Sequence, residues 1–405
     1  MADGTRQRVA ARGAQGIGPR LARRPRRGLV PARRPPGQPG ASPVPATRPR
    51  GTLTAARRLS RRHELVTVLL GLWLMIGLFV DGWAHTNRAQ LETFFTPWHA
   101  LFYSGFAATA AWIAWRIIKE QESGRRGRVA VPLGYGLGLV GVVLFAAGGF
   151  GDMLWHMALG VEQNIDALFS PTHLLLFTGI VAILSSPLRA AWSDAADDPR
   201  PSLRAFLPVL LSITLATALV SFMFMYFSAF TGNPADQSWV HWAATQSGDG
   251  SFEVLSIEEG IARIMATNLI LLAPVLLLVR RWRLPFGSVT VLWTTVAVLT
   301  SAITEFRFVW LIAAAALGGV AVDTLLRRLR VSSRRPQALW FLGVVAPLPL
   351  WSAYFAITAL SGGIGWSIEL WAGSIVWAAL LGGGLAVLCQ PPVAPAAMPS
   401  GRGRP

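Results

Sequence analysis

The stretch ELVTVLLGLWLMIGLFVDGWAH at residues 64–85 decides the fold class, because its apolar run is as long as a bilayer is thick. A helix rises ~1.5 Å per residue, so about 20 apolar residues cross the ~30 Å hydrocarbon core. Similar runs recur as far as residue 390. Of the 405 residues, 53% are hydrophobic and 14% charged, whereas about a quarter of a soluble domain is charged. The sequence predicts an all-α, polytopic integral membrane protein.

Ten transmembrane helices are predicted. They are expected at 65–84, 95–117, 131–157, 170–188, 205–230, 258–280, 285–303, 308–326, 337–360 and 367–390. Residues 1–63 hold sixteen Arg and a single Asp among many Pro, Gly and Ala, a composition typical of disordered chain. The expected parts are a disordered cytoplasmic tail at 1–63, duplicated helical hairpins at 64–190, a six-helix scaffold at 191–390 and a disordered cytoplasmic tail at 391–405.

Loop charges predict the orientation in the bilayer. Basic residues gather at 1–63, 118–130, 281–284 and 327–336. Of the intervening loops, those at 85–94, 158–169, 231–257 and 361–366 contain only Arg88 as a basic residue. Because basic loops stay inside, we expect both termini in the cytoplasm of a plasma (inner) membrane protein. The Arg-rich tail is expected to be a solvated segment that fixes this topology; contact of its arginines with anionic lipid head groups is the alternative, and no nucleic acid is expected as a partner.

Four of the six histidines fall into two copies of one pattern. The first copy reads FVDGWAH at 79–85 and ETFFTPWHALFYSG at 92–105. The second reads FGDMLWH at 150–156 and DALFSPTHLLLFTG at 166–179. Each copy has an Asp four residues before one His and an acid seven residues before a second His, which follows Thr/Ser-Pro. So many matched positions indicate an internal repeat.

The spacing within each copy suits a metal site. Asp81 and His85 share one helix face, and Thr96 is a predicted N-cap that places His99 in the first turn of the next helix. A carboxylate inside a span costs about 3 kcal/mol, so a metal ion is one expected partner; a hydrogen-bonded Asp–His pair at a wet helix end is the alternative. The candidate ligands are Asp81, His85, His99, Asp152, His156 and His173, with Glu92, Asp166 and His241 as possible outer contacts.

The second copy, from Asp152 to Leu174, resembles the metal-binding stretch of the C subunit of the copper membrane monooxygenases, which act on methane or ammonia. In that family an Asp-x-x-x-His on one membrane helix precedes an Asp and a Thr-Pro-Ser-His that opens the next helix. The resemblance implies copper on Asp152, His156 and His173, and more loosely on Asp81, His85 and His99. It covers residues 76–180 only, has a longer gap between its two histidines, and implies partner membrane subunits.

Several functions remain open from the sequence. Zinc or iron would accept the same ligand types as copper, and no catalytic residue is identified, so an oxidoreductase subunit stays one hypothesis. A metal-ion or small-molecule transporter is the main alternative, although few charges lie near the expected midplane and no broken helix is visible. A haem protein with four axial histidines and a non-catalytic scaffold complete the alternatives. Cys389 is the only cysteine, which excludes an intramolecular disulfide.

Overall fold

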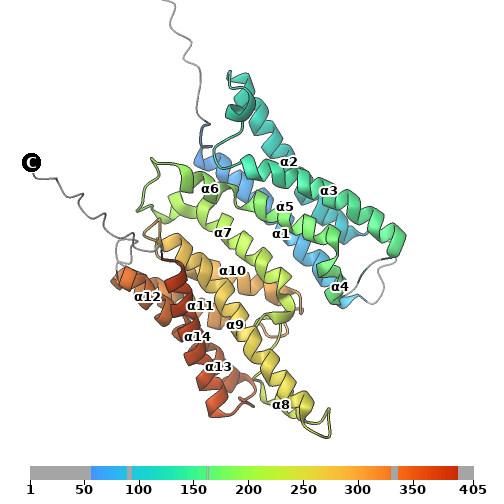
Figure 1. Ribbon diagram of the computed structural model, residues 1–405, viewed down its shortest axis with the longest axis vertical. Helices are drawn as coiled ribbons and strands as arrows, with labels where there is room; N and C mark the ends of the chain where they lie inside the picture. Colours follow the sequence, from blue (N-terminus) through green and yellow to red (C-terminus); the bar gives the residue numbers. More distant parts are fainter. Residues whose placement is uncertain (1–55, 89–93, 161, 163, 330–335, 391–405) are drawn as a thin grey trace, which may run out of the picture. The chain divides into compact units, whose positions relative to one another are not determined.

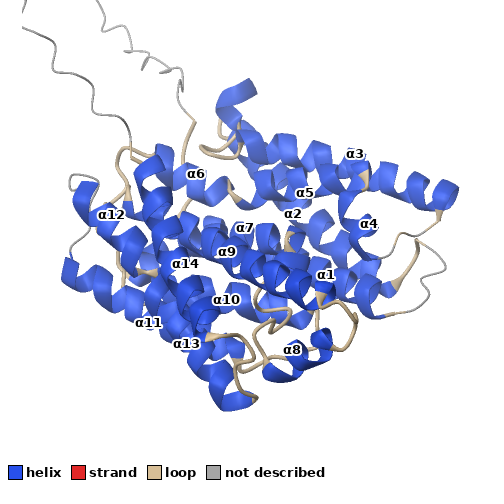
Figure 2. Ribbon diagram, turned by 60° about the horizontal axis from the view of Figure 1, so that its bottom comes forward, coloured by secondary structure: helices blue, strands red, loops and turns tan. Residues whose placement is uncertain are grey.

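The computed structural model describes residues 56–88, 94–160, 162, 164–329 and 336–390, and these form helices almost throughout (Figure 1). Apart from an isolated bridge between Asp236 and Ile364, none of the described residues pairs as a strand (Figure 2). The all-α prediction is therefore confirmed for this part of the chain. Most of the predicted tails at 1–63 and 391–405 lies outside the described residues.

The helices are named here in chain order. They are α1 (Arg61–Asn87), α2 (Pro97–Glu122), the 3-10 turn η1 (Gly127–Ala130), α3 (Gly136–Leu159), α4 (Asn164–Phe169), α5 (Pro171–Leu184), α6 (Ser186–Ser193), α7 (Leu203–Met223), η2 (Met225–Phe227), α8 (Gln237–Ala244), α9 (Ser251–Val279), α10 (Ser288–Ala302), α11 (Leu311–Leu329), α12 (Pro336–Val345), α13 (Pro347–Ser361) and α14 (Ile368–Leu388).

Seven helical segments of the described chain are long and apolar enough to cross a membrane. They are α1, α2, α3, α7, α9, residues Gln337–Ser361 and α14, and the bent pair α5–α6 makes eight if it counts as one span. Among the remaining predicted spans, α10 has only 15 residues, and α11 carries Asp323, Arg327 and Arg328. Each of the ten predicted segments coincides with helix, so a membrane protein is supported, while the number of crossings stays a prediction.

One apolar helix pair is bent at a break, which corrects the expectation that no helix is broken. Helices α5 and α6 meet at Ser185 with a bend of 41°. The cause is local, because Pro187 at the start of α6 has no backbone N–H. It cannot donate the helical hydrogen bond to the carbonyl four residues before it, and the helix is interrupted there. Side chains donate to carbonyls at the break, since Arg189 donates to the carbonyl of Ala182 at 2.7 Å and Ser212 Oγ donates to that of Leu184 at 2.5 Å.

Helices α1 and α2 form the first hairpin, and their backbones touch through two glycines. A Cβ atom on Gly77 would lie 2.6 Å from the Cα atom of Phe102. A Cβ on Gly105 would lie 2.6 Å from the Cα of Leu74. Small residues permit such close approach between helices in a bilayer, where no hydrophobic effect drives them together.

Helices α3 and α5 form the second hairpin with the same construction (Figure 1). A Cβ atom on Gly148 would lie 3.1 Å from the backbone nitrogen of Leu176, and one on Gly179 would lie 2.9 Å from that of Phe145. In both hairpins one glycine stands four residues before the Asp and the other six residues after the second His. Corresponding residues therefore make corresponding contacts in the two hairpins.

Helix α7 joins the hairpins to the rest of the described chain, because it packs against α1 and α5 on one side and α9 and α10 on the other. Further helix pairs, α10 with α11, α11 with α13 and α12 with α14, extend the packing (Figure 2). The large buried side chains Trp282, Trp293, Trp351 and Tyr354 all lie in this second half. The polar cluster treated below lies in the hairpins instead.

The segment just before α1 is fastened by ion pairs. The Arg58 guanidinium bonds Glu64 at 2.8 Å and also pairs with Asp197. Trp282 Nε1 donates to the same Asp197 at 2.6 Å. Burial lowers the pKa of Arg58, but the carboxylates of Glu64 and Asp197 outweigh it and hold that pKa above its usual value. The segment that these ion pairs hold in place therefore includes Arg58, which precedes the predicted start of the first span at residue 65.

We predict that the glycine contacts limit the stability of both hairpins. Gly105→Ala and Gly179→Ala should each lower the free energy of unfolding by roughly 1–3 kcal/mol, because a methyl group would press on the backbone of the neighbouring helix. Gly136→Ala is the matched control, since a Cβ atom there meets nothing within 4 Å. Thermal unfolding of the purified variants measures the effect; equal stability of all three would contradict the prediction.

Candidate metal centre

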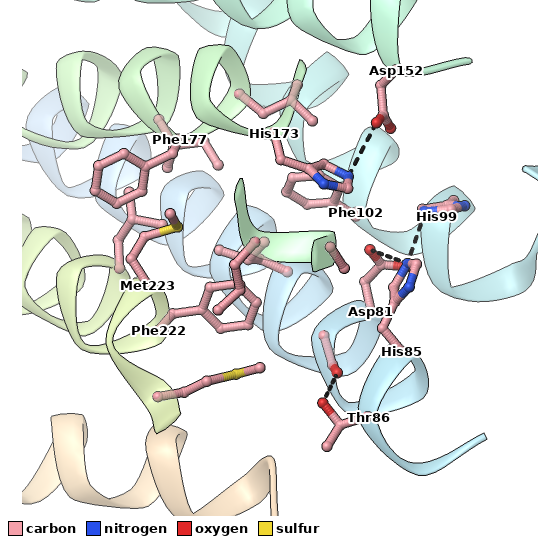
Figure 3. A pocket seen from close by; sticks show the side chains of 18 residues that line it. Asp81, His85, Thr86, His99, Phe102, Asp152, His173, Phe177, Phe222 and Met223 are labelled. Atoms are coloured by element: carbon pink, nitrogen blue, oxygen red, sulfur yellow. Dashed lines mark hydrogen bonds and ion pairs between the residues drawn. The ribbon is translucent and has the colours of Figure 1, made fainter. Parts of the chain in front are cut away.

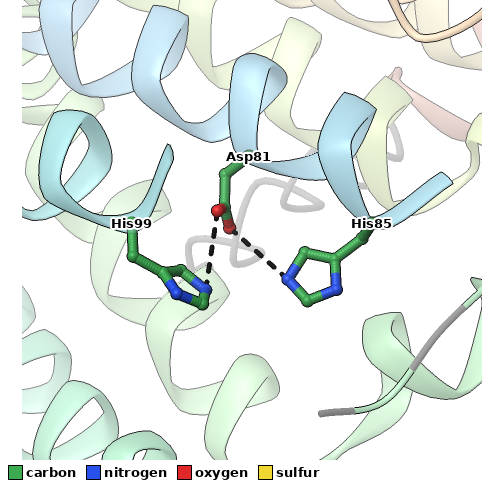
Figure 4. A group of neighbouring side chains, drawn as sticks. All are labelled: Asp81, His85 and His99. Carbon is green, nitrogen blue, oxygen red and sulfur yellow. Dashed lines mark ion pairs between the residues drawn. The ribbon is translucent and has the colours of Figure 1, made fainter. Parts of the chain in front are cut away.

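The first hairpin brings three predicted ligands together where α1 ends and α2 begins. Thr96 caps α2, accepting a hydrogen bond from the backbone N–H of His99 at 3.1 Å, as predicted. His99 Nε2 lies 3.5 Å from Asp81 Oδ1. His85 Nε2 lies 3.9 Å from Asp81 Oδ2, so the carboxylate stands between the two rings (Figure 4).

The second hairpin repeats this arrangement at the end of α3 and the start of α5. Ser170 accepts a hydrogen bond from the backbone N–H of His173 at 3.4 Å, again as predicted for an N-cap. His156 Nε2 lies 3.4 Å and His173 Nε2 3.1 Å from Asp152 Oδ1. Figure 3 shows His173 directed at Asp152.

The two sets of ligands form one group. The ring centroid of His156 lies 5.9 Å from that of His99 and 6.4 Å from that of His85. Tyr103 of the first hairpin donates its hydroxyl hydrogen to Asp152 Oδ2 of the second at 3.1 Å. The sequence predicted a set in each hairpin and did not place the sets against each other. We call the six residues Asp81, His85, His99, Asp152, His156 and His173 the Asp/His cluster.

Hydrogen bonds at the outer side of three rings assign their tautomer. In each ring Nδ1 faces a backbone carbonyl, which can only accept, so Nδ1 carries a hydrogen. In a neutral ring Nε2 then has a lone pair directed into the cluster, the form that binds metal. The three pairs are His85 with the carbonyl of Glu162 at 3.0 Å, His99 with that of Phe94 at 2.6 Å and His156 with that of Gly160 at 3.2 Å.

The inward atoms of the first set have no hydrogen-bond partner among the described residues. Oδ1 of Asp81 and Nε2 of His85 and His99 are buried and unsatisfied, as is Nε2 of His156. Asp81 is 7%, His85 8% and His99 3% exposed. A buried polar atom without a partner costs about 1–3 kcal/mol, and a carboxylate oxygen repels a nitrogen lone pair unless a cation or proton lies between them.

The geometry of these atoms fits a metal ion. The potential ligand atoms of Asp81, His85 and His99 all lie within 4.8 Å of one another, and those of His99, Asp152 and His156 form a second such group. His99 belongs to both. Buried Asp and His residues of this kind could hold a metal ion, and the residues leave its identity open.

The two carboxylates differ in their surroundings. Asp152 Oδ1 accepts a hydrogen bond from the hydroxyl of Thr172 at 3.1 Å, in addition to the contacts with Tyr103 and His173. Asp81 Oδ1 has no hydrogen bond. Asp81 therefore has the more available ligand atom.

Glu162 belongs to this site and was not predicted. Its Oε2 atom lies 3.1 Å from His156 Nδ1, and its backbone carbonyl faces His85 Nδ1. One residue therefore orients a histidine from each hairpin. The loop after α3 is longer than the corresponding loop of the first copy, so comparison of the copies gives Glu162 no counterpart; the nearby acid in the sequence is the only signal that could have found it.

Two of the three predicted outer contacts, Asp166 and His241, are exposed. Asp166 lies on α4 and His241 on α8. Among the described residues, neither belongs to a group that could hold a metal ion. Glu92 lies outside the described residues.

An apolar cavity adjoins the cluster. Its volume is about 60 Å³, and Asp81, His85, His99, Asp152 and His173 all contribute to its wall. The opposite wall is apolar, formed among others by Phe102, Phe177, Phe222 and Met223 (Figure 3). A ligand in this cavity would contact the Asp/His residues on one side and apolar side chains on the other.

Comparison with known proteins gives no relative: no family model matches the chain, and neither a curated protein nor a solved structure matches it. Fold and geometry define the class as an all-α membrane protein with a buried Asp/His cluster that could hold a metal ion.

We predict that Glu162 strengthens metal binding through His156. The Glu162 carboxylate lies 3.1 Å from His156 Nδ1 without a hydrogen bond to it, so its negative charge acts on the ligating imidazole through space; loss of an outer partner lowers metal affinity about 10–100-fold. Glu162→Gln should therefore weaken binding of Cu(II) or Zn(II) in competition titrations. Asp166→Asn is the matched control, because Asp166 is a nearby acid that is exposed. Equal affinities for both variants would remove Glu162 from the site.

Proposed function

We propose that this chain is a membrane metalloprotein whose Asp/His cluster holds one or two ions, with copper as the expected metal. One observation carries the proposal: Asp81 Oδ1, His85 Nε2 and His99 Nε2 are buried, mutually close and without hydrogen-bond partners. A cation at their centre would remove the repulsion between the carboxylate and the lone pairs. Imidazole with carboxylate suits copper, zinc or iron, whereas calcium and magnesium prefer oxygen ligands.

Each residue has a defined task in this proposal. Asp81, His85 and His99 hold the first ion. Asp152 and His156 hold the second, with His173 as the further nitrogen that already contacts Asp152. Three protein ligands leave open coordination positions, and copper, when bound, supplies one-electron redox chemistry. The surrounding helix ends exclude water and keep the rings in one tautomer.

We also propose that the hairpins α1–α2 and α3–α5 are an internal repeat, remotely related to the C subunit of the copper membrane monooxygenases. The matched glycine contacts, the two Pro-initiated helices with hydroxyl caps and the matched Asp–His pairs support duplication. The relation to that family rests on the motif from Asp152 to His173. It would make this chain one subunit of a membrane oxidoreductase.

The proposed topology has ten spans with both termini in the cytoplasm of a plasma membrane. The cluster then faces the extracytoplasmic side, at the ends of α1 and α3. The basic loops and the Arg58 ion pairs lie toward the other ends of these helices, as the positive-inside rule requires.

The break between α5 and α6 does not favour a transporter over this function. A transport site is expected where a helix break exposes carbonyls near the bilayer centre. Here Arg189 and Ser212 already donate to carbonyls at the break, those of Ala182 and Leu184. The Asp/His cluster instead contacts α5 through His173, at the opposite end of that helix from Ser185.

Metal analysis of the purified full chain tests the proposed function. Protein from copper-supplemented cells should contain about one to two copper equivalents. His99→Gln should lose most of this metal, because His99 belongs to both groups; loss of a ligand should cost more than the roughly 10–100-fold of an outer partner. His241→Gln, an exposed histidine outside the cluster, should retain it. Metal-free wild-type protein, or equal metal contents in the two variants, would exclude the proposal.

A further inference from the structure

A second cavity lies at the same end of the helices as the Asp/His cluster but shares no residue with the cavity beside it. It has a volume of about 450 Å³ and is lined by residues from the loop before α8, from α8 and α9, and from the turn between α10 and α11. Asn87 beside the cluster donates to the carbonyl of Ile303 in that turn at 2.9 Å. We call this cavity the Arg307 pocket; the residues that carry the argument are Trp239, Trp242, Glu259, Arg263 and Arg307.

One guanidinium in the wall, that of Arg263, has a nitrogen atom that is free of hydrogen bonds to described residues. Arg263 donates from Nε and Nη2 to the same oxygen of Glu259, at 3.0 and 2.7 Å. Its Nη1 has no hydrogen bond to any described residue and lies against Gly232, where a Cβ atom would come within 2.8 Å. The Arg263 side chain is only 21% exposed, so this nitrogen atom is directed into a partly desolvated space.

The second guanidinium is free of ion pairs within the described chain. Arg307 is exposed and lies 5.6 Å from the ring of Phe308. It follows two non-glycine residues with left-handed backbones, Glu305 at φ 53° and Phe306 at φ 57°. Trp83 Nε1 holds this turn through Glu305 Oε1 at 3.2 Å. Consecutive left-handed residues are uncommon and persist where surrounding contacts impose them, frequently at binding sites.

The rest of the wall combines three aromatic rings, those of Trp239, Trp242 and Phe308, with small polar and apolar residues and a second acid, Asp236. Trp239 and Trp242 lie with ring centroids 4.8 Å apart. Asp236 caps α8, accepting hydrogen bonds from the backbone N–H groups of Ser238 at 2.9 Å and Trp239 at 3.3 Å. Since Glu259 is paired with Arg263, the two charges of the wall without an ion pair to a described residue are the carboxylate of Asp236 and the guanidinium of Arg307.

We propose that the Arg307 pocket binds a single oxyanion group, a carboxylate or a phosphate, carried on an apolar body. Arg307 and Nη1 of Arg263 supply charged donors for the anion, and guanidinium groups favour these planar or tetrahedral oxyanions. The tryptophan rings supply the apolar contact. A phospholipid and a free small organic anion both have this chemistry.

Thermal unfolding of the full chain in detergent tests the pocket with two matched pairs of probes. Dioleoyl phosphatidylglycerol is compared with dioleoylglycerol, and benzoate with benzamide. The anionic member of at least one pair should raise the unfolding midpoint of the wild type more than its neutral partner. Stabilisation by the phospholipid alone identifies a lipid site, and stabilisation by benzoate a site for free anions; both outcomes support the proposal.

Variants connect this response to the pocket. Arg307→Gln should raise the apparent dissociation constant of the anionic probe at least about tenfold, the usual cost of a charged hydrogen bond, and Arg307→Lys should recover part of it. Arg88→Gln is the control, because Arg88 is an exposed arginine that, like Arg307, lies near an aromatic ring, 5.0 Å from that of Trp83. The proposal is overturned if no anion stabilises the wild type beyond its neutral partner, or if Arg307→Gln and Arg88→Gln weaken binding equally.

Discussion

At the ends of four helices, two buried carboxylates face imidazole nitrogens whose hydrogens lie on the far side of their rings. The backbone carbonyls of Glu162, Phe94 and Gly160 fix that orientation. The protein thereby concentrates electron-rich atoms in a site buried from bulk solvent, an arrangement that is unfavourable unless a positive charge joins it. The loops and helix caps around the cluster all serve to hold the rings in this orientation.

The cluster depends in turn on how closely the helices approach. In each hairpin two glycines bring the backbones into contact, and this sets the height at which the Asp on one helix meets the His on the next. A bilayer supplies no hydrophobic force between helices, so such packing decides their position. Tyr103 then connects the hairpins through Asp152. Contacts of small residues and one hydroxyl group thus determine the geometry of the polar site.

The sequence was sufficient wherever structure follows from local chemistry. Asp81 and His85 share a face because of helical periodicity, and Thr96 and Ser170 cap their helices because each precedes a proline. The all-α class followed from the apolar runs. It was insufficient where residues distant in sequence decide the geometry, as they do for the shared position of His99 and for the contacts of Glu162. The bend at Ser185 was missed although its cause, Pro187, is local. The count of ten spans and the identity of a metal remain predictions.

The place of His99 in both ligand groups has a thermodynamic consequence. One nitrogen lone pair ligates one ion, so an ion bound through Asp81 and His85 removes a ligand from Asp152 and His156. The two positions are therefore linked, and occupancy of one changes the affinity of the other by a reciprocal coupling free energy. Such a centre would bind two ions in two steps of unequal affinity. The ion that His99 ligates would be bound more tightly than the other.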